Sequence, residues 1–334
     1  MDNNLLKATE LTGILGRKEM DQLEALYGEP WVEYRKSYEL SASLELSSFP
    51  IQLDIELNAS CNLRCPMCPI SAESAKGKGP STWFSYEFYK KLIDYAVING
   101  TRAVKLNYIN EPLIRKDLVR FIEYAKSAGI LDIYLSTNGV LMSKDICADL
   151  IKSGLTRVQV SIDATTEDIY DRMRPGGDFQ KVLKNIALLL QLKKELNSET
   201  PLVRVNFVKT ELNEHQLEEF IEYWNGRVDM IGIQEFIKPT KSNETIKSHT
   251  SVDKRKNGFK CSFPFKQLVI TNELNVLPCC TFWGEELKLG RLEKPEDLLS
   301  FWNSEKMVEL RRIHSNGEYY TIPQCQQCVE GGLE

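Results

Sequence analysis

The sequence predicts an α/β fold in which six β-strands alternate with helices, followed by a smaller α+β unit. Short apolar segments rich in β-branched and aromatic residues alternate with helical patterns from residue 51 to residue 237. A polar stretch at 238–260 separates this region from the C-terminal remainder. Repeated βα units build a parallel sheet with right-handed crossovers. The pattern is typical of a partial (β/α)6 barrel and of a doubly wound sheet, and in both folds ligands bind at the carboxyl ends of the strands.

Strand and helix segments follow one another regularly along the chain. The expected strands are 51–57, 103–109, 131–136, 156–162, 202–208 and 228–237. The expected helices are 85–100, 117–129, 143–154, 178–196 and 213–224. The helix at 178–196 has the clearest apolar stripe, formed at 3.6-residue spacing by Phe179, Val182, Leu183, Ile186, Leu189 and Leu190. Three glycines at helix ends are expected to be left-handed caps, namely Gly100, Gly129 and Gly154.

We expect three regions, with boundaries at 1–50, 51–240 and 241–334. The first is an N-terminal extension, with a helix around 15–28 that packs against the strand–helix core. The second is the core itself. The third is a small domain with a hairpin turning near Asn272–Asn275 and a helical pattern over 295–314, where Pro295 lies near a first turn.

Composition narrows the classes of function. The chain has 334 residues and a net charge of −5, so its electrostatics favour neither nucleic acid nor an anionic membrane as partner. We find no signal peptide and no apolar run of transmembrane length, which predicts a cytoplasmic protein. In a reducing compartment, the nine cysteines more often bind metal or do redox chemistry than form disulfides.

The cysteines fall into two groups. Cys147 stands alone in a helical pattern and is interpreted as a small buried hydrophobe. The first group, Cys61, Cys65 and Cys68 in CNLRCPMC, follows the first strand. Three thiolates on one loop can hold a metal centre, but zinc and cubane iron–sulfur sites normally take four protein ligands, so a cubane here would keep one iron open. The second group is Cys261, Cys279, Cys280, Cys325 and Cys328.

The spacing C-x3-C-x2-C after a first strand resembles the signature of the radical S-adenosylmethionine (radical SAM) superfamily, with Met67 where an aromatic residue is usual. Motifs after the next three strands also resemble that family: NYINEPL, LSTNG and VSIDA, followed by DRMRPGG. The residues that match are Asn110, Glu111, Ser136, Thr137, Asn138, Ser161, Asp163 and Arg174, with Arg172 as the rival of Arg174. The resemblance covers about residues 51–237 and implies a partial (β/α)6 TIM-like barrel.

By this resemblance, the first three cysteines hold a [4Fe–4S] cluster whose open iron binds SAM. Glu111 is expected to accept hydrogen bonds from the SAM ammonium group, and Arg174 to bind its carboxylate. Reductive cleavage of SAM would give a 5′-deoxyadenosyl radical that abstracts a hydrogen atom from the substrate. An external one-electron donor, such as flavodoxin or ferredoxin, is implied.

The second group resembles the SPASM/twitch extension of this superfamily, which implies a small C-terminal α+β iron–sulfur domain with one auxiliary [4Fe–4S] cluster. Its four ligands would be Cys261, Cys279, Cys325 and Cys328, with Cys279 favoured over the adjacent Cys280 by motif position. On spacing alone, a zinc ribbon is the alternative.

The substrate reaction stays open between oxidation (dehydrogenation) and epimerisation of a small polar molecule, such as a sugar or aminoglycoside. Peptide modification by a maturase or epimerase is the alternative within the superfamily. Cys280 is a candidate hydrogen-atom donor, and Asp163 or Glu235 a candidate base. Gln234, Glu235 and Lys238 are expected on the substrate side.

Two interpretations lie outside this enzyme class, namely an iron–sulfur electron-transfer or sensor protein and a zinc-dependent binding module. Only the first would hold iron. The three histidines, His215, His249 and His314, have no identifiable partners and are expected at the surface.

Overall fold

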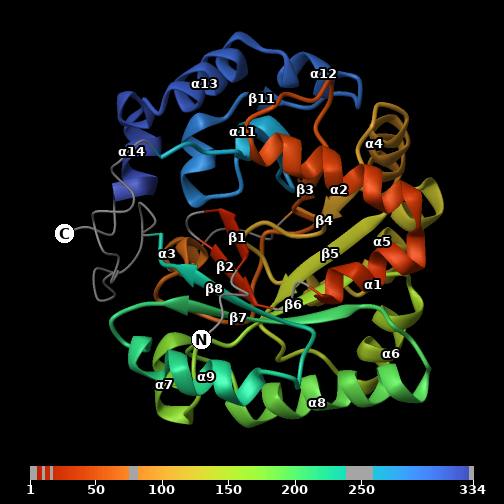
Figure 1. Cartoon of the computed structure of the whole chain (residues 1–334), viewed down its shortest axis with the longest axis vertical. Helices are drawn as coiled ribbons and strands as arrows, with labels where there is room; N and C mark the ends of the chain where they lie inside the picture. Colours follow the sequence, from red (N-terminus) through yellow and green to blue (C-terminus); the bar gives the residue numbers. More distant parts are fainter. Residues whose placement is uncertain (1–5, 10–11, 16–17, 75–81, 238–258, 331–334) are drawn as a thin grey trace.

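The computed structural model describes residues 6–9, 12–15, 18–74, 82–237 and 259–330. At its centre lie six parallel strands in sequence order, as predicted (Figure 1). They are β3 (Gln52–Ile55), β4 (Ala103–Lys105), β5 (Asp132–Thr137), β6 (Arg157–Ser161), β7 (Leu202–Lys209) and β8 (Met230–Glu235). Helices connect successive strands, which confirms the α/β class and the six-unit partial barrel.

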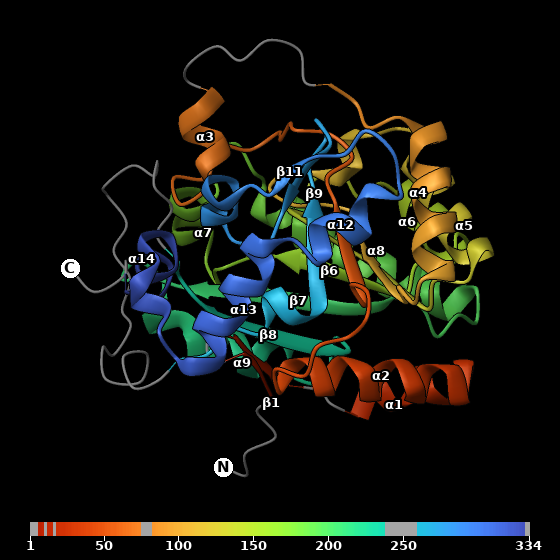
Figure 2. The ribbon, with the colours of Figure 1, turned by 90° about the horizontal axis from the view of Figure 1, so that it is seen from above.

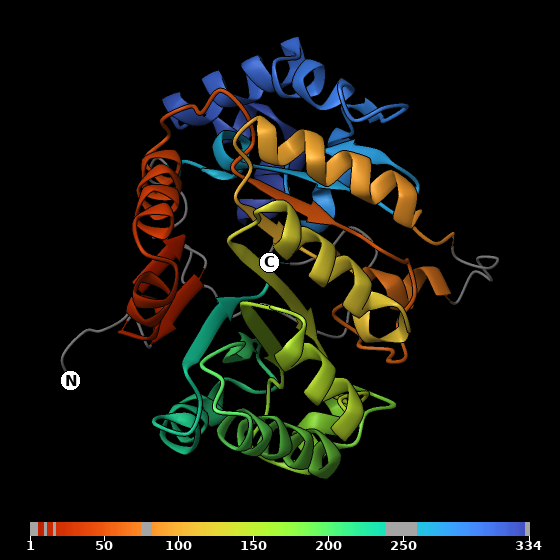
Figure 3. The same cartoon turned by 90° about the vertical axis from the view of Figure 1, so that its right-hand side faces the viewer.

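The five predicted helices are present (Figure 3). They are α4 (Tyr86–Ile98), α5 (Leu118–Ala128), α6 (Lys144–Lys152), α8 (Phe179–Glu195) and α9 (Leu217–Trp224). Side chains of Ser85, Ser143 and Asp178 cap the first turns of α4, α6 and α8. Gly129 follows α5 in the left-handed conformation, with a φ of 105°, as its capping role requires. Between β3 and β8, two short α-helices of the described chain were not predicted, α3 (Pro69–Ser74) and α7 (Glu167–Met173).

The N-terminal extension is more than the single expected helix. It begins with a hairpin of β1 (Leu6–Thr9) and β2 (Thr12–Leu15), and β2 pairs antiparallel with β8 at one edge of the sheet. Two helices follow, α1 (Lys18–Tyr27) and α2 (Glu29–Ala42), which lie along one side of the molecule in Figure 3. The extension therefore lengthens the central sheet as well as packing against it.

The C-terminal region extends the opposite edge of the same sheet (Figure 2). After α11 (Phe263–Lys266), strand β9 (Gln267–Ile270) pairs parallel with β3. The predicted hairpin is confirmed, because β10 (Asn275–Leu277) pairs antiparallel with β9, and β11 (Gly290–Arg291) with β10. The expected boundary at 240/241 lies outside the described residues.

The helical pattern over 295–314 contains two helices rather than one. They are α12 (Asp297–Trp302) and α13 (Glu305–Asn316). Ser304 separates them, and its side chain accepts a hydrogen bond from the Met307 N–H, a cap that starts α13 afresh. The described chain closes with α14 (Pro323–Glu330), and no described helix has the length and apolarity needed to span a lipid bilayer.

The two faces of the six central strands differ in character. Alternate side chains such as Leu53, Val104 and Val158 join the large apolar core under the helices. Most of the other alternate positions, which face the interior of the barrel, carry polar side chains, and most of these are buried: Gln52, Asp54, Glu56, Lys105, Asn107, Ser136, Arg157, Gln159, Ser161, Arg204 and Asn206. Apolar exceptions such as Ala103, Leu202 and Met230 lie at the amino ends of their strands. A parallel strand buried on both faces is usually a continuous apolar run, so this barrel interior is built for polar contacts.

Helix α2 closes the barrel at the amino ends of the strands. The Tyr34 hydroxyl donates to Asp132 Oδ2 at 2.9 Å, and Arg157 donates to both carboxylate oxygens of Asp132, at 2.9 and 2.6 Å. Lys266 Nζ donates to the Tyr38 hydroxyl at 3.3 Å. These contacts close the barrel at the amino ends of its strands. A ligand can therefore enter only at the carboxyl ends.

Candidate functional site

The three-cysteine loop leaves the carboxyl end of β3. Cys65 is buried, and Cys61 and Cys68 are half-buried. Burial raises the pKa of Cys65 to about 11 and that of Cys68 to about 12. The free thiols therefore hold their protons at neutral pH, and the thiolates form when a metal centre replaces those protons. Three such sulfurs fit a cubane with one open iron.

Glu111 follows β4 and lies at this same end of the barrel. Its carboxylate accepts hydrogen bonds from the Leu113 N–H at 3.1 Å, the Thr137 hydroxyl at 2.7 Å and the Asn138 N–H at 2.8 Å. Burial is the largest influence on this carboxyl and raises its pKa. Oε1 already accepts two of these bonds, but Oε2 accepts only the one from Asn138, so its second lone pair can still accept from a ligand ammonium group.

The polar residues after β5 connect Glu111 to the cysteine loop. Asn138 Nδ2 donates to Asn62 Oδ1 at 2.9 Å and lies 3.9 Å from Cys61 Sγ. Ser136 points elsewhere, because its hydroxyl donates to Gln159 Oε1 at 3.1 Å inside the barrel. The structure therefore brings Thr137 and Asn138 to the cysteine loop and Ser136 to the barrel interior.

Asn110, Met67 and Ser161 take different positions. Asn110 is buried and holds the loop after β3, since its Nδ2 donates to Asn58 Oδ1 at 2.8 Å. Met67 is buried and packs in the main core beside Cys65. Ser161 is half-buried at the end of β6, at an inward-facing position. A ligand contact by any of the three stays a prediction.

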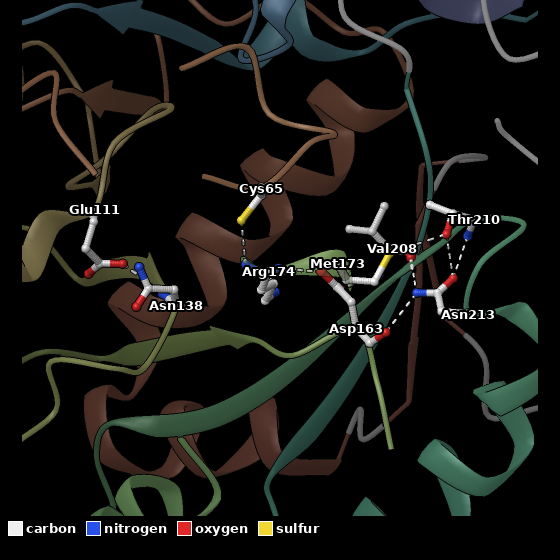
Figure 4. Close-up of polar contacts among 9 residues, drawn as sticks. All are labelled: Cys65, Glu111, Asn138, Asp163, Met173, Arg174, Val208, Thr210 and Asn213. Atoms are coloured by element: carbon white, nitrogen blue, oxygen red, sulfur yellow. Dashed lines mark hydrogen bonds and ion pairs between the residues drawn. The ribbon is translucent and has the colours of Figure 1, made fainter. Parts of the chain in front are cut away.

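Asp163, Arg174 and Cys65 form a chain of contacts below the cysteine loop (Figure 4). Arg174 Nη2 donates to Asp163 Oδ2 at 2.5 Å, and Arg174 Nη1 lies 3.9 Å from Cys65 Sγ. Arg174 Nε is buried and has no hydrogen-bond partner among the described residues, so this donor is free for a ligand. The rival Arg172 is exposed on α7, which supports Arg174 as the SAM contact.

Asp163 is held rigidly. Its Oδ1 accepts from the Val208 N–H at 2.8 Å, and its carbonyl oxygen accepts from Asn213 Nδ2 at 2.9 Å (Figure 4). It is fully buried and adopts a φ of 65°, a region that Asp tolerates better than most residues. With both carboxylate oxygens engaged, this geometry supports a role in positioning Arg174, and action as a base stays a prediction.

The second cysteine group surrounds a cavity. Cys261, Cys279, Cys325 and Cys328 line the same space of about 270 Å³, with apolar walls that include Phe259 and Trp283. Burial raises the pKa of each of these thiols, to about 12 for Cys261. These four residues, brought together from three segments, are the ligands that the sequence assigned to an auxiliary cluster.

The spacing of the four thiols around this cavity can be compared with the spacing that a zinc ion requires. Four sulfurs around one zinc ion would lie about 3.8 Å apart, given a Zn–S bond of about 2.3 Å. Among the described residues, no three His, Cys, Asp or Glu side chains are close enough to share a single metal ion. The four thiols around one cavity match the four protein ligands of a cubane iron–sulfur cluster.

Cys280 turns away from that cavity. It packs against Tyr108, Val269 and Leu277, and Asp54 and Lys105 from the barrel interior influence its ionisation. Burial raises the pKa of Cys280 to about 12. The adjacent cysteines therefore face two different environments, and Cys280 contacts the barrel.

The expectation that His314 lies at the surface is wrong. His314 is buried on α13 beside the four-cysteine cavity, and its Nδ1 accepts a hydrogen bond from the Cys261 N–H at 3.3 Å. The sequence carried no signal for this contact because it joins residues 53 positions apart. His215 is exposed as predicted, and His249 lies outside the described residues.

Replacing Cys325 by serine is expected to remove the auxiliary cluster and leave the first. Anaerobically reconstituted protein should fall from about eight to about four irons per chain, because two cubanes hold four irons each. Cys280→Ser is the matched control and should retain about eight, since Cys280 lies outside the cavity. An equal loss of iron in both variants would contradict the assignment of Cys279 as ligand.

Glu56 is a site residue that the sequence analysis missed. It is buried at the carboxyl end of β3, where its oxygens accept from the N–H groups of Ile109 and Asn272, each at 3.4 Å. Burial raises its pKa to about 8. The signal was present in the alternation QLDIE, which places a polar residue at every inward position of β3.

The raised pKa of Glu56 predicts a pH dependence of stability. Between about pH 4.5 and 8 the folded protein keeps a proton that the unfolded chain has lost, so the free energy of unfolding falls as the pH rises through this window. Glu56→Gln cannot ionise, so its thermal midpoint should fall less than the wild-type midpoint between pH 6 and pH 8. Parallel midpoint curves for the two proteins would contradict this.

Comparison with known proteins agrees with this geometry. Residues 55–225 match the model of the radical SAM superfamily, and residues 261–329 match an iron–sulfur cluster-binding domain, SPASM. A probable GTP 3′,8-cyclase of Methanococcus vannielii is 34% identical over 196 residues, or 58% of this chain and 60% of that protein. A GTP 3′,8-cyclase of Desulforamulus reducens is 34% identical over half of each chain. The chain thus matches about half to three-fifths of the length of these relatives.

Three solved structures share the fold. SuiB of Streptococcus suis, bound to S-adenosylmethionine, superposes with a TM-score of 0.64 at 17% identity, over 93% of this chain and 82% of that one. The structure of anSMEcpe with bound AdoMet superposes with a TM-score of 0.61 at 14% identity, over 85% of this chain and 89% of that one. The structure of BtrN in complex with AdoMet and 2-DOIA superposes with a TM-score of 0.53 at 17% identity, over 84% of this chain and 93% of that one. The chain belongs to the radical SAM superfamily and carries a C-terminal SPASM iron–sulfur domain.

Proposed function

We propose that this radical SAM/SPASM enzyme abstracts a hydrogen atom from a small polar substrate inside the barrel and then oxidises or epimerises it. One observation carries the proposal, namely that polar side chains occupy most inward positions of strands β3 to β7, next to the three-cysteine loop. A polar lining binds a polar molecule through hydrogen bonds. An apolar lining offers no hydrogen bonds to replace those that the molecule loses to water.

The chain's own residues orient the cofactor. Bound at this site, the [4Fe–4S] cluster and SAM supply reductive cleavage to methionine and a 5′-deoxyadenosyl radical. Glu111 would accept from the SAM ammonium group, while Arg174, fixed by Asp163, would offer its free Nε to the carboxylate. The electron comes from an external donor of the flavodoxin or ferredoxin class.

Two outcomes are consistent with the residues around the barrel. In oxidation, the substrate radical would lose a proton, and an auxiliary cluster held by Cys261, Cys279, Cys325 and Cys328 would take up one electron. That proton needs a base, and Glu235, the residue suggested by the sequence, is not favoured by the geometry: it shares the outward face of β8 with Ile231 and Ile233, where its Oε1 pairs with Lys209 at 2.7 Å. In epimerisation, the Cys280 thiol would instead give a hydrogen atom to the opposite face of the substrate, and one electron from the external donor together with a proton would restore the resulting thiyl radical to the thiol.

Peptide modification is the second candidate. An open groove lined by Trp83, Phe88, Leu274 and Arg291 lies between the start of α4 and the β9–β10 turn. Trp83 is half exposed there, and an exposed aromatic in a groove is a common peptide contact. A second SuiB structure is bound to a precursor peptide, SuiA, and an anSMEcpe structure is bound to AdoMet and the Kp18Cys peptide.

Deuterium transfer tests the proposal and separates the two candidates. Reconstituted holoenzyme, SAM and dithionite are incubated with perdeuterated sugars and aminoglycosides or with a perdeuterated peptide mixture. We expect 5′-deoxyadenosine in all samples, and mass spectrometry should find deuterium in it only with the sugar mixture. Deuterium from the peptides alone would select peptide modification, and protein that makes no 5′-deoxyadenosine would overturn the proposal itself.

A further inference from the structure

We propose that Arg204 binds an anionic group of the substrate, a carboxylate or a phosphate, inside the barrel. This inference rests on the proposed function and names the chemical class of its substrate. It is carried by a buried guanidinium that has no acidic partner among the described residues and by a glycine that makes room for it on the neighbouring strand.

Arg204 lies on β7 at an inward-facing position. Its neighbours along the strand, Val203 and Val205, belong to the apolar core on the other face, so the Arg204 side chain points into the barrel. Only 6% of Arg204 is exposed. In the described part of the chain its guanidinium makes one hydrogen bond, from Nε to Asn206 Oδ1 at 2.6 Å, which leaves the Nη groups to face the interior.

A buried cation is costly unless it is paired. None of the ion pairs formed by the described residues includes Arg204. The titratable groups that act on it are Arg157, whose positive charge repels it, and the hydroxyl groups of Tyr134 and Tyr38. Burial lowers the pKa of Arg204 to about 10, so the side chain stays charged at neutral pH. An anionic ligand would supply the missing countercharge.

The other buried arginines show how the chain satisfies such groups elsewhere. Arg157 donates to both oxygens of Asp132, and Arg174 pairs with Asp163. Arg311, whose Nη groups also lack hydrogen bonds among the described residues, lies over the ring of Trp302 with its Cζ 4.1 Å from the centroid. Arg204 has neither a carboxylate nor such a ring contact in the described ranges, which marks it as a ligand-binding side chain.

Gly232 on β8 clears the space that the guanidinium occupies. A Cβ atom at this position would collide with Arg204 Nε, Arg204 Nη2 and Asn206 Oδ1. Asn206 and Gly232 are register partners on adjacent strands, and Asn206 holds Nε in place. The arginine is therefore positioned before any ligand arrives, and its planar fork suits the bidentate binding of an oxyanion.

Anion titration of the reconstituted holoenzyme with SAM tests this inference. Inorganic phosphate or acetate is added at an ionic strength held constant with chloride, and the thermal midpoint is recorded. We expect one of the two anions to raise the wild-type midpoint saturably. Phosphate would indicate a phosphorylated substrate, and acetate a carboxylic acid. Arg204→Gln should raise the half-saturating concentration at least tenfold, and the exposed Arg227→Gln should leave it unchanged.

Two further variants keep the test decisive if Arg204→Gln folds poorly. Arg204→Lys keeps the charge but loses the fork, and Gly232→Ala displaces an intact Arg204, so both should weaken anion binding. No saturable response in the wild type, or an unchanged response in all three variants, would overturn the inference. Formation of 5′-deoxyadenosine by the same protein reports separately on the proposed function, because SAM cleavage depends on the cysteine loop rather than on Arg204.

Discussion

Replacing Cys65 by alanine is expected to abolish SAM cleavage. The loop supplies only three thiolates to its cluster, so the loss of one leaves two protein ligands and no stable cubane. The variant should lose about four of eight irons and form 5′-deoxyadenosine under dithionite at less than about one hundredth of the wild-type rate, since the cofactor supplies the chemistry.

Cys147→Ala is the matched control. Cys147 is buried in the apolar core, where its thiol lies 3.7 Å from the Met142 carbonyl oxygen. Its loss should cost about 1 kcal/mol of stability through a small cavity, while the iron content and SAM cleavage stay at wild-type values. Near wild-type cleavage in Cys65→Ala would show that this loop does not hold the reactive cluster.

Asp163→Asn is expected to have the largest effect on stability among conservative changes at this site. Asn fits the same volume and tolerates the φ of 65°, but it leaves the buried Arg174 guanidinium without a countercharge. Breaking such a buried pair typically costs about 3–5 kcal/mol. A thermal midpoint lower by on the order of 10 °C follows.

The same substitution should weaken SAM binding, because Asp163 fixes the arginine that faces Cys65. Equilibrium binding of SAM to reconstituted protein would measure this effect, with Asp171→Asn as the control, because Asp171 is an exposed residue of α7. If Asp163→Asn matched the control in both midpoint and SAM affinity, Asp163 would not position Arg174.

Local patterns predicted the elements that depend on neighbouring residues. The strand alternation, the left-handed cap at Gly129, and the cysteine loop after β3 all follow from residues close together in sequence. The same holds for the edge at which the site lies, because parallel strands place their carboxyl ends together.

Contacts between distant segments could not be predicted in this way. The pairing of β9 with β3 joins Leu268 to Leu53, and no local periodicity encodes such a partner. The contact of His314 with Cys261 and the fit of Arg204 against Gly232 are likewise settled only when the chain has folded. The break between α12 and α13 depends on a local feature, the capping side chain of Ser304. It was not predicted because the apolar positions before and after Ser304 resemble those of one continuous helix.

The continuous sheet fixes the distance over which electrons can tunnel. Strand β3 leads directly into the loop of Cys61, and β9, hydrogen-bonded to β3, leads through β10 to Cys279. The two cluster sites are therefore attached to one ladder of backbone hydrogen bonds rather than to two bodies joined by a hinge. We expect the separation of the redox centres to stay constant through turnover, so that substrate is admitted by loops and side chains at the mouth and the auxiliary domain does not swing away.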